Sequence, residues 1–377
     1  MSKKPTILQL TPALHQGGVE RGTVEMANFL HEAGWGSVVA SAGGSMKRDL
    51  ERDVLHLNIS MKRKTPIEIA KAYFKLVAYI KENPVDLIHA RSRVPAWVAY
   101  FVSRKTGVPY LTTYHGTYGM QNAFKKFYNS AMVRGRHVIA ISKFIETHVN
   151  QYFPSHPDMS LAYRGFDVSR FQYSNTVLKA AEELREKYSF HVGVPILMLP
   201  GRVTRWKGQV EFIEALASLK DLDFYALLVG GAEEKQKPYL EELKGMVSKY
   251  GLEDRVIFAG NAENIVPYYA LSDVVVAPSS SPEAFGRTPI EASCMAKPIV
   301  ATAHGGALET IKDGETGFHF AVGDIKGMAK ILRSLIENEP LRRKLGENGK
   351  SFVEKTFTLK NMCNAELSAY KQVLKVK

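Results

Sequence analysis

Two carboxylates, Glu283 and Glu291, stand eight residues apart in the stretch SSSPEAFGRTPIE. The apolar run VVVAP before this stretch is typical of a parallel strand that is buried on both faces. Thr288 and Pro289 suit the cap and the first position of a following helix. Open α/β sheets bind ligands at such strand–loop–helix corners. There the carboxylates could accept hydrogen bonds from sugar hydroxyls, and free helix N–H groups could hold a phosphate.

Each acid also has a purely structural interpretation. Thr288 and Glu291 have the spacing of a capping box, in which the carboxylate would bond only the backbone N–H of Thr288. Glu283 could be a solvated acid on a loop. The other loops that follow predicted strands therefore help to decide whether the two acids bind a ligand or are only structural.

A basic loop follows the strand predicted over ILMLP and opens the next helix. Its sequence, GRVTRWKG, contains Arg202 and Lys207. Two permanent cations at the start of a helix suit the binding of a diphosphate. This loop and the two acids lie in the same half of the chain.

Glycine and histidine loops follow two strands in the first half of the chain. Gly17 and Gly18 come after the strand ILQL and can bring the backbone close to a ligand. His115 ends the strand predicted over YLTTY. Together the four loops predict a cleft between two sheets that holds a nucleotide-linked, hydroxyl-rich ligand.

The elements that position these loops alternate between strand and helix along the whole chain. Such alternation predicts doubly wound, mostly parallel sheets. The pattern breaks and restarts once, so we expect two Rossmann-like domains. We place the first at residues 1–166 with a helix at 358–377 added to it, and the second at 167–357.

One predicted helix, from Pro66 to Glu82, has an apolar stripe. Ile67, Ala70, Phe74 and Val77 recur on it at helical spacing. Such a stripe is more often core packing than a membrane anchor. We therefore expect this stripe to be buried.

Composition indicates an ordinary globular protein. Of 377 residues 45% are hydrophobic and 23% charged, and no apolar run is long enough to cross a membrane. The first residues have no signal-peptide cleavage site, so we expect a cytoplasmic protein. Cys294 and Cys363 are too few for a disulfide framework and lack metal-ligand spacing.

The net charge of +12 is concentrated in the first half of the chain. Residues 1–165 contain 22 Lys and Arg against 11 Asp and Glu, whereas residues 166–377 contain 28 against 27. A one-sided basic surface implies an anionic partner, such as a phosphorylated substrate, an acidic lipid surface or a nucleic acid. The alternative is that these charges only confer solubility.

The ensemble of motifs resembles the retaining glycosyltransferases of family 4, which have the GT-B fold. The step from Glu283 to Glu291 is similar to their E-x7-E motif, and the loop with Arg202 and Lys207 resembles their donor-phosphate loop. Gly17-Gly18 resembles their N-terminal glycine loop. The resemblance covers essentially the whole chain. It implies two Rossmann-like domains facing a cleft, with the last helix crossing back to the first domain.

The resemblance also implies roles for single residues. Arg202 and Lys207 would bind the donor diphosphate, Glu291 the ribose hydroxyls and Glu283 the transferred sugar. The reacting sugar would lie at His115. Backbone contacts to the donor would come from Gly17, Gly18, Phe285 and Gly286. Arg287 departs from the aliphatic residue usual after that glycine, and would either contact a phosphate or fix the loop.

The expected reaction is the transfer of a hexose to an acceptor hydroxyl with retention of configuration and without a metal or other cofactor. The donor is a GDP- or UDP-sugar, with GDP-mannose favoured. The acceptor is an anionic glycan or glycolipid of the lipopolysaccharide core or a related envelope glycan. The basic first domain would contact the inner face of the cytoplasmic membrane, and no nucleic acid is expected as a partner.

Three alternatives stay open at this point. Asp221-Leu-Asp223 is a D-x-D triplet, as in metal-dependent glycosyltransferases, although we interpret it as a solvated turn. A nucleotide-sugar epimerase would need no acceptor. A non-catalytic protein that binds an anionic partner such as RNA would use the basic half, but no RNA-binding motif is present.

Overall fold

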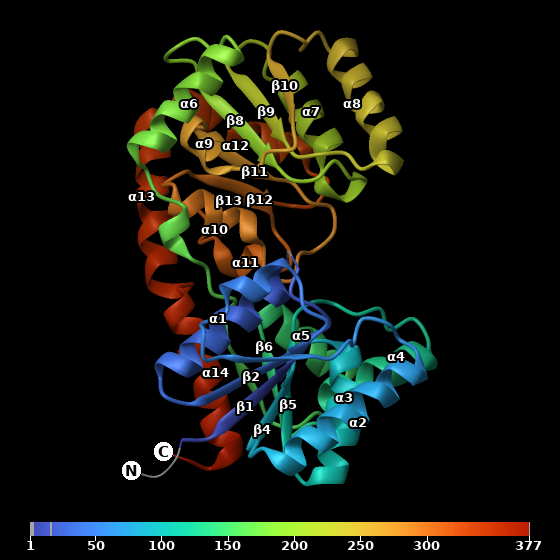
Figure 1. Cartoon of the computed structure of the whole chain (residues 1–377). Coiled ribbons are helices and arrows are strands. Elements are labelled where there is room, and N and C mark those ends of the chain that lie inside the picture. The colour runs from blue at the N-terminus through green and yellow to red at the C-terminus, as the bar shows by residue number, and fades with distance from the viewer. Residues whose placement is uncertain (1–3, 16, 377) are drawn as a thin grey trace. The chain divides into compact units, whose positions relative to one another are not determined.

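The chain folds into two compact units in the computed structural model, which describes residues 4–15 and 17–376 (Figure 1). Unit 1 combines Met1–Gly165 with Leu359–Lys377, and unit 2 spans Phe166–Thr358. Each division between the units lies one residue from the place expected from the sequence. The chain therefore ends in the unit in which it begins.

Unit 1 is built on a seven-stranded sheet in the order β3-β2-β1-β4-β5-β6-β7. Every neighbouring pair in it is parallel, so all its strands end at the same edge. Nearly every residue of β1, β2, β4, β5 and β6 is buried, as expected for a parallel sheet that is covered on both faces, whereas the edge strands β3 and β7 are only partly buried. They are β1 Thr6–Leu10, β2 Gly36–Ser41, β3 Leu55–Asn58, β4 Leu87–Ala90, β5 Tyr110–Tyr114, β6 His137–Ala140 and β7 Met159–Leu161.

Helices cover both faces of this sheet (Figure 1). One face carries α1 (Gly18–Glu32) and α14 (Leu359–Leu374), whose apolar sides form a common core with the strands. The other face carries α2 (Pro66–Glu82) and α3 (Arg93–Thr106), which pack on each other. The shorter helices α4 (Ala123–Asn129) and α5 (Lys143–Tyr152) follow β5 and β6.

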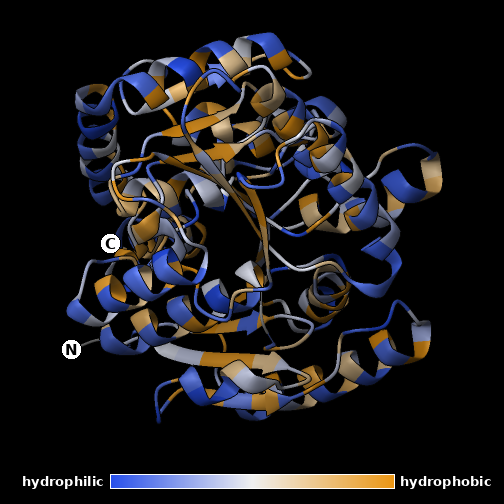
Figure 2. Cartoon of the chain, turned by 90° about the horizontal axis from the view of Figure 1, so that it is seen from above, coloured by the Kyte–Doolittle hydropathy of each residue, from blue (hydrophilic) through white to orange (hydrophobic). Residues whose placement is uncertain are grey.

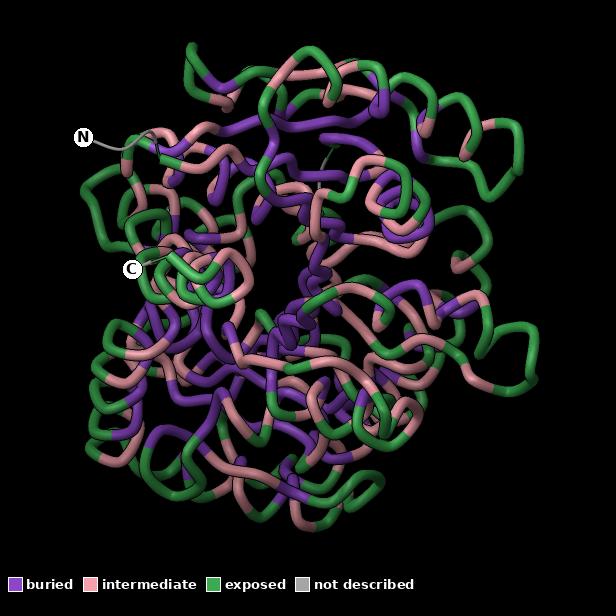
Figure 3. Tube along the Cα trace, turned by 90° about the horizontal axis from the view of Figure 1, so that it is seen from below, coloured by how far each residue is buried: buried purple, intermediate pink, exposed green. Residues whose placement is uncertain are grey.

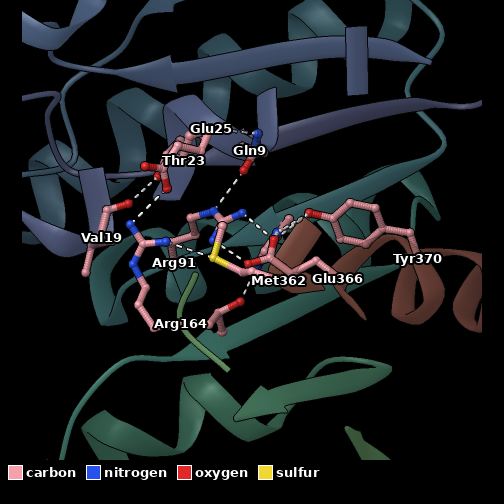
Figure 4. Close-up of polar contacts among 11 residues, drawn as sticks. Gln9, Val19, Thr23, Glu25, Arg91, Arg164, Met362, Glu366 and Tyr370 are labelled. Carbon is pink, nitrogen blue, oxygen red and sulfur yellow. Dashed lines mark hydrogen bonds and ion pairs between the residues drawn. The ribbon is translucent and has the colours of Figure 1, made fainter. Parts of the chain in front are cut away.

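A buried polar network joins α14 to the sheet (Figure 4). The guanidinium of Arg91, just after β4, donates to both carboxylate oxygens of Glu366, at 3.1 and 2.6 Å, and to Gln9. His89 bonds the hydroxyls of Tyr370 and Thr113 at 2.6 and 2.7 Å. Buried polar groups need such partners. The network therefore fixes where the last helix docks.

The apolar stripe expected to be buried on α2 is exposed in the structure. Ile67 is 69% and Phe74 68% exposed, and Ala70 is exposed too. The helix instead buries Ala72, Leu76 and Val77. The expectation was therefore wrong except for Val77. The helix turns a neighbouring stripe, formed by the three buried residues, toward the sheet and α3.

Unit 2 repeats the architecture with a six-stranded parallel sheet in the order β10-β9-β8-β11-β12-β13. Its central strands are fully apolar and buried, and apolar colour runs along the strands of both units in Figure 2. The strands are β8 Ile196–Pro200, β9 Tyr225–Val229, β10 Val256–Gly260, β11 Val274–Ala277, β12 Ile299–Thr302 and β13 Gly317–Phe320.

Helices again cover both faces of the sheet. One face carries α7 (Gln209–Ala217), α8 (Lys237–Lys249) and α12 (Ile325–Glu337), which share a large core with the strands. The other helices are α6 (Asn175–Lys187), α9 (Val266–Leu271), α10 (Arg287–Cys294), α11 (Ala307–Thr310) and α13 (Glu339–Thr356). Of these, α6 packs on α9, and α10 on α13. Burial concentrates along the strands of each unit, as Figure 3 shows in purple.

Both units are therefore Rossmann-like α/β domains, as expected. No helix within the described ranges 4–15 and 17–376 is long and apolar enough to cross a membrane.

Candidate active site

The central contact of the candidate site joins Lys207 and Glu283. Lys207 ends the short 3₁₀ helix η4 (Arg205–Lys207) after β8, and Glu283 lies in the loop after β11. Their charged atoms, Nζ and Oε1, lie 2.6 Å apart, and Ser279 Oγ donates to the same carboxylate oxygen at 3.2 Å. Both side chains keep part of their surface open to solvent. The structure thus brings a predicted phosphate-binding cation and a predicted sugar-binding acid together.

Glycine at position 208 allows these two loops to meet. Gly208 has a positive φ of 75°, and a Cβ there would lie 2.0 Å from the carbonyl oxygen of Pro278. Only glycine fits such an approach without strain. The backbone N–H of Ser280 also donates to the carbonyl of Trp206 at 2.8 Å. The loop after β8 is therefore held directly against the loop after β11.

A third loop, after β12, closes a small pocket around Glu283. The N–H of Gly306 donates to the backbone oxygen of Glu283 at 2.8 Å. A side chain at Gly305 would collide with the same backbone. His304 Nε2 lies 2.8 Å from the carbonyl oxygen of Ser279. The residues that line the pocket are Ala277, Ser279, Glu283, Gly286, Pro289, Ala301, Thr302, His304 and Ala307.

Glu291 is buried on α10 and has two side-chain partners. Its carboxylate accepts from the hydroxyl of Tyr269 and from the guanidinium of Arg287, both at 2.9 Å. Burial raises the pKa of Glu291, while Arg287 and Tyr269 act to lower it. The carboxylate faces these two side chains rather than the backbone of Thr288. Arg287 thus forms an ion pair with the acid four residues further along the same helix.

Helix α10 begins earlier in the chain than we predicted from the sequence. Gly286, with φ 79° and ψ 87°, occupies the cap position, and α10 starts at Arg287. The expectation that Thr288 caps the helix and Pro289 opens it was wrong. Gly286 turns the chain in a left-handed conformation, and Pro289 still fits because the N–H groups of a first helical turn need no partner within the helix.

Arg202 lies on the same loop as Lys207, but its side chain points elsewhere. It is 69% exposed, and its nearest acid is Glu233, at 3.6 Å. Its backbone carbonyl accepts from Gln209 at 3.0 Å, which anchors the loop to α7. The structure therefore does not join the Arg202 guanidinium to the contact between Lys207 and Glu283.

The ring of Phe285 points into unit 2. It is buried and meets Phe357 edge to face, with ring centroids 5.5 Å apart. This packing fixes the backbone between Glu283 and Gly286, from which the predicted N–H contacts to a ligand would come.

The predicted residues of the first half lie at the strand ends of unit 1. Gly17 caps α1 and Gly18 begins it; both are exposed, and a Cβ at Gly18 would meet no atom within 4 Å. Burial, with the charges of Arg91 and Arg164, holds the pKa of His115 well below its usual value. His115 Nε2 is buried and has no hydrogen-bond partner among the described residues. A neutral imidazole with an unused nitrogen therefore stands at the end of β5.

Asp221 of the D-x-D triplet makes a bidentate ion pair with Arg333, at 2.7 and 2.8 Å. It precedes β9 and so lies at the edge of the sheet opposite Lys207 and Glu283. Within residues 4–15 and 17–376, no group of three or more His, Cys, Asp or Glu side chains is placed to hold a metal ion.

The sequence analysis missed two side chains of this site. Tyr269 holds Glu291 from α9, a helix without any motif, and no signal in the sequence pointed to it. His304 precedes the pair Gly305-Gly306 directly, and that close-packed turn is the signal that could have found it.

Comparisons with known proteins identify the family of the chain. The profile described as Glycosyltransferase Family 4 matches residues 16–170, and the profile described as Glycosyl transferases group 1 matches residues 180–352. A solved glycosyltransferase from Rickettsia africae ESF-5 is 36% identical over 99% of this chain and 100% of that chain, with a TM-score of 0.88.

This chain is a family 4 glycosyltransferase. Its similarity to other members is uneven along the chain. The lipopolysaccharide core biosynthesis mannosyltransferase LpsB of Rhizobium meliloti (strain 1021) is 32% identical to this glycosyltransferase over 217 residues, which are 56% of this chain and 60% of LpsB. Anabaena HepE, solved with UDP, is 24% identical over 97% of this chain and 100% of HepE, with a TM-score of 0.84. The latter similarity shows a shared fold, the GT-B fold of two Rossmann-like domains.

Proposed function

We propose that this glycosyltransferase moves a hexose from a nucleotide-diphosphate sugar to an acceptor hydroxyl with retention of anomeric configuration. The contact between Lys207 and Glu283 carries the proposal. It places a cation and a hydroxyl-accepting acid at the carboxyl edge of the unit 2 sheet, the edge where such folds bind ligands.

Lys207 would stabilise the leaving group. The bond between the anomeric carbon and the β-phosphate oxygen breaks, and negative charge grows on that phosphate. A preorganised cation at this place lowers the barrier because it interacts more strongly with the transition state than with the ground state. Arg202 would join it by exchanging Glu233 for the diphosphate, since both side chains are largely exposed.

Glu283 and Glu291 would bind hydroxyls of the donor. A diphosphate would replace Glu283 as the counter-ion of Lys207, which frees the Glu283 carboxylate for the transferred sugar. Glu291 accepts two hydrogen bonds in the structure, and a carboxylate can accept about four. Its remaining lone pairs would bind the ribose hydroxyls.

The acceptor oxygen would attack the same face of the anomeric carbon that the leaving phosphate occupies. Its proton would pass to the departing phosphate oxygen, so that neither a metal ion nor a protein nucleophile is needed. The neutral imidazole of His115 would serve as a hydrogen-bond partner of the reacting sugar, since Nε2 has no partner among the described side chains.

The donor we propose to test first is GDP-mannose, with UDP-sugars as the alternative. The similarity to LpsB, a mannosyltransferase of lipopolysaccharide core biosynthesis, supports a mannosyl donor and a glycolipid acceptor of that class. The excess of cations in unit 1 fits an acceptor that carries phosphate or carboxylate groups.

A donor screen followed by product analysis tests the proposal. A nucleotide sugar at about 100 times its Kd should add roughly 2.7 kcal/mol to the free energy of unfolding. With a matching acceptor, the enzyme should release the nucleoside diphosphate, and NMR should show the donor's anomeric configuration in the product. Inverted product would contradict the mechanism. Conversion between two donor sugars without an acceptor would indicate an epimerase instead.

A further inference from the structure

The most exposed aromatic residues of the chain gather on three helices of unit 1. Among the described residues, all phenylalanines that are largely exposed lie on α2, α3 or α4, with exposed fractions between 44% and 77%. They are Phe74, Phe101, Phe124 and Phe127, and Ile67 of α2 is equally exposed. In unit 2 the exposed apolar side chains are scattered and contain no phenylalanine. We call this surface, with the cations around it, the α2–α4 face (Figure 1).

The aromatic side chains of the α2–α4 face form a continuous surface. A groove between α2 and α3 is lined by Tyr73, Phe74, Tyr100 and Phe101. The buried ring of Trp97 connects this groove to α4, because it lies 5.9 Å from the ring of Phe101 and 5.3 Å from that of Phe127. Contiguous apolar patches of this kind are rare on monomeric proteins and mark interaction sites.

Cations without acidic partners surround this surface. The segment 61–136 contains 14 Lys and Arg but only 3 Asp and Glu, so it holds the whole charge excess of the first half of the chain. No carboxylate among the described residues lies within ion-pair distance of the exposed cations around the aromatic rings. They are Lys71 and Lys75 on α2, Arg104 and Lys105 on α3, Lys125 and Lys126 on α4, Lys64 over the ring of Tyr128, and Arg134.

The cations also lie over the rings. The guanidinium of Arg134 is 5.5 Å from the ring centroids of Trp97 and Phe127, and that of Arg104 is 5.8 Å from that of Tyr100. Long basic side chains can lay their stems on apolar surface and keep the charge in a polar layer. Exposed apolar side chains bordered by cations match a bilayer surface, because the cations can contact anionic headgroups while the apolar side chains reach the acyl chains.

We propose that the α2–α4 face binds the surface of an anionic bilayer. Ile67 and the four phenylalanines would enter the boundary between headgroups and acyl chains, and the surrounding Lys and Arg would contact lipid phosphates. A nucleic acid would satisfy the cations but would leave an aliphatic side chain such as Ile67 without a partner. The proposal deepens the proposed function, because it names the surface by which the enzyme would reach a lipid-linked acceptor.

Electrostatic attraction of this kind has a measurable size. Each Lys or Arg near an anionic leaflet contributes about fivefold in affinity, and salt weakens the effect. Binding to vesicles of neutral lipid should therefore be at least about tenfold weaker than binding to vesicles with 30% anionic lipid. Raising the salt concentration should narrow that difference.

Vesicle co-sedimentation of the full chain, without any sugar donor, tests the proposal. Lys71→Glu/Lys75→Glu reverses two exposed charges one turn apart on α2, and Lys326→Glu/Lys330→Glu makes the same change on α12 of unit 2. Phe74→Ser/Phe124→Ser removes apolar surface from the face, and Leu178→Ser/Val192→Ser does so from exposed sites in unit 2. We expect Lys71→Glu/Lys75→Glu to lose at least about tenfold in affinity, because two cations alone account for more than that, and Phe74→Ser/Phe124→Ser to lose a similar amount, because it removes two apolar side chains from the bilayer boundary. Both control variants should bind as the wild type does.

Several results would overturn the proposal: equal binding to neutral and anionic vesicles, or α2–α4 variants that still sediment with anionic vesicles. Self-association that is lost in Phe74→Ser/Phe124→Ser, without vesicle binding by the wild type, would assign the face to a second copy of the chain. Preferential binding of a single-stranded oligonucleotide would assign it to nucleic acid. Circular dichroism and thermal unfolding of each variant show whether it is folded, and thermal stabilisation by a nucleoside diphosphate shows that unit 2 is intact. A lack of glycosyl transfer would contradict the proposed function but not the binding of the α2–α4 face to vesicles, because the vesicle assay needs no sugar donor. A lack of vesicle binding would contradict only the membrane proposal.

Discussion

The guanidinium of Arg91 and the carboxylate of Glu366 form a bidentate ion pair between residues that are 275 positions apart, and both residues are at most 2% exposed. The pair joins the strand β4 to the helix α14, the last element of the chain. Figure 4 shows Arg91 between Gln9 on one side and Glu366 on the other. A charged contact at this depth stabilises the fold only while both partners are present.

Removing one partner should therefore be costly. We expect Arg91→Met and Glu366→Leu each to lower the free energy of unfolding by about 3–5 kcal/mol, since each leaves a buried charge without its counter-ion. Arg91→Met/Glu366→Leu should recover much of that loss, because an apolar pair needs no desolvated charge. Urea unfolding of the three variants gives the coupling energy. Additive losses in the double variant would contradict this account.

Loss of either member of the Lys207–Glu283 contact should impair catalysis far more than folding. Lys207→Ala and Glu283→Ala should each lower kcat/KM by about two orders of magnitude or more, the size of effect seen when one donor to a developing oxyanion is removed. Lys244→Ala is the control, because Lys244 is an exposed lysine of unit 2 that pairs only with Glu241. Steady-state release of the nucleoside diphosphate measures the effect. Turnover like that of the wild type in both variants would refute the site assignment.

Tyr269 should control the affinity for the nucleotide. Tyr269→Phe removes one of the two hydrogen bonds to Glu291 and leaves a buried carboxylate less well oriented for ribose. A loss of about 1.4 kcal/mol would weaken nucleotide binding tenfold. Isothermal titration calorimetry with GDP and UDP measures this change. Tyr268→Phe, a change at the neighbouring half-buried tyrosine, should leave the affinity unaltered; equal Kd values in both variants would rule out the role given to Tyr269.

The buried histidines of unit 1 should make the fold sensitive to acid. Burial first, and the charge of Arg91 next, hold the pKa values of His89 and His115 well below the usual value. Below about pH 6.5 the unfolded chain binds protons that the folded chain does not, so stability falls as the pH falls. Each such histidine contributes up to about 1.4 kcal/mol per pH unit. In thermal unfolding between pH 7 and pH 5, the free energy of unfolding should decrease less steeply in His115→Gln than in the wild type, and the difference should equal the contribution of one histidine. An unchanged slope would mean that folding does not lower the pKa of His115.

Gly208 should tolerate no side chain. Gly208→Ala forces a Cβ into a left-handed backbone and against the carbonyl of Pro278, which should cost about 2–4 kcal/mol. Gly245→Ala is the matched control inside α8, where an added Cβ meets no atom within 4 Å. That change should stabilise the protein by about 0.5–1 kcal/mol. Urea unfolding measures both changes, and a neutral Gly208→Ala would contradict the close approach of the two loops.

Local patterns predicted much of this fold. The apolar runs that became β8 and β11 are continuous because both faces of a parallel strand are covered, and such runs can be recognised without a structure. The strand β7, Met159–Leu161, was not predicted. It has only three residues, all half-buried, and so carries no such signal.

The site was predictable where its residues lie close to strand ends and not where partners come from elsewhere. Lys207 and Glu283 each follow a strand of the same parallel sheet, so their proximity follows from topology. Tyr269 reaches Glu291 from a different helix, and the buried pairing of Glu366 with Arg91 depends on a tertiary contact that no local pattern encodes. The apolar stripe with Ile67 was misassigned because periodicity shows that a helix has an apolar side but not what covers it.

The return of α14 to unit 1 has a consequence for biosynthesis. Residues 1–165, which contain all seven strands of the unit 1 sheet, leave the ribosome long before Leu359–Leu374 is made, so the apolar surface that α14 covers stays exposed while roughly two hundred further residues are translated. Unit 2, a single uninterrupted segment, can reach its native state first although it is made second. Expression of the amino-terminal half by itself should therefore give insoluble material, and supplying the missing carboxyl-terminal peptide in the same cell should rescue it.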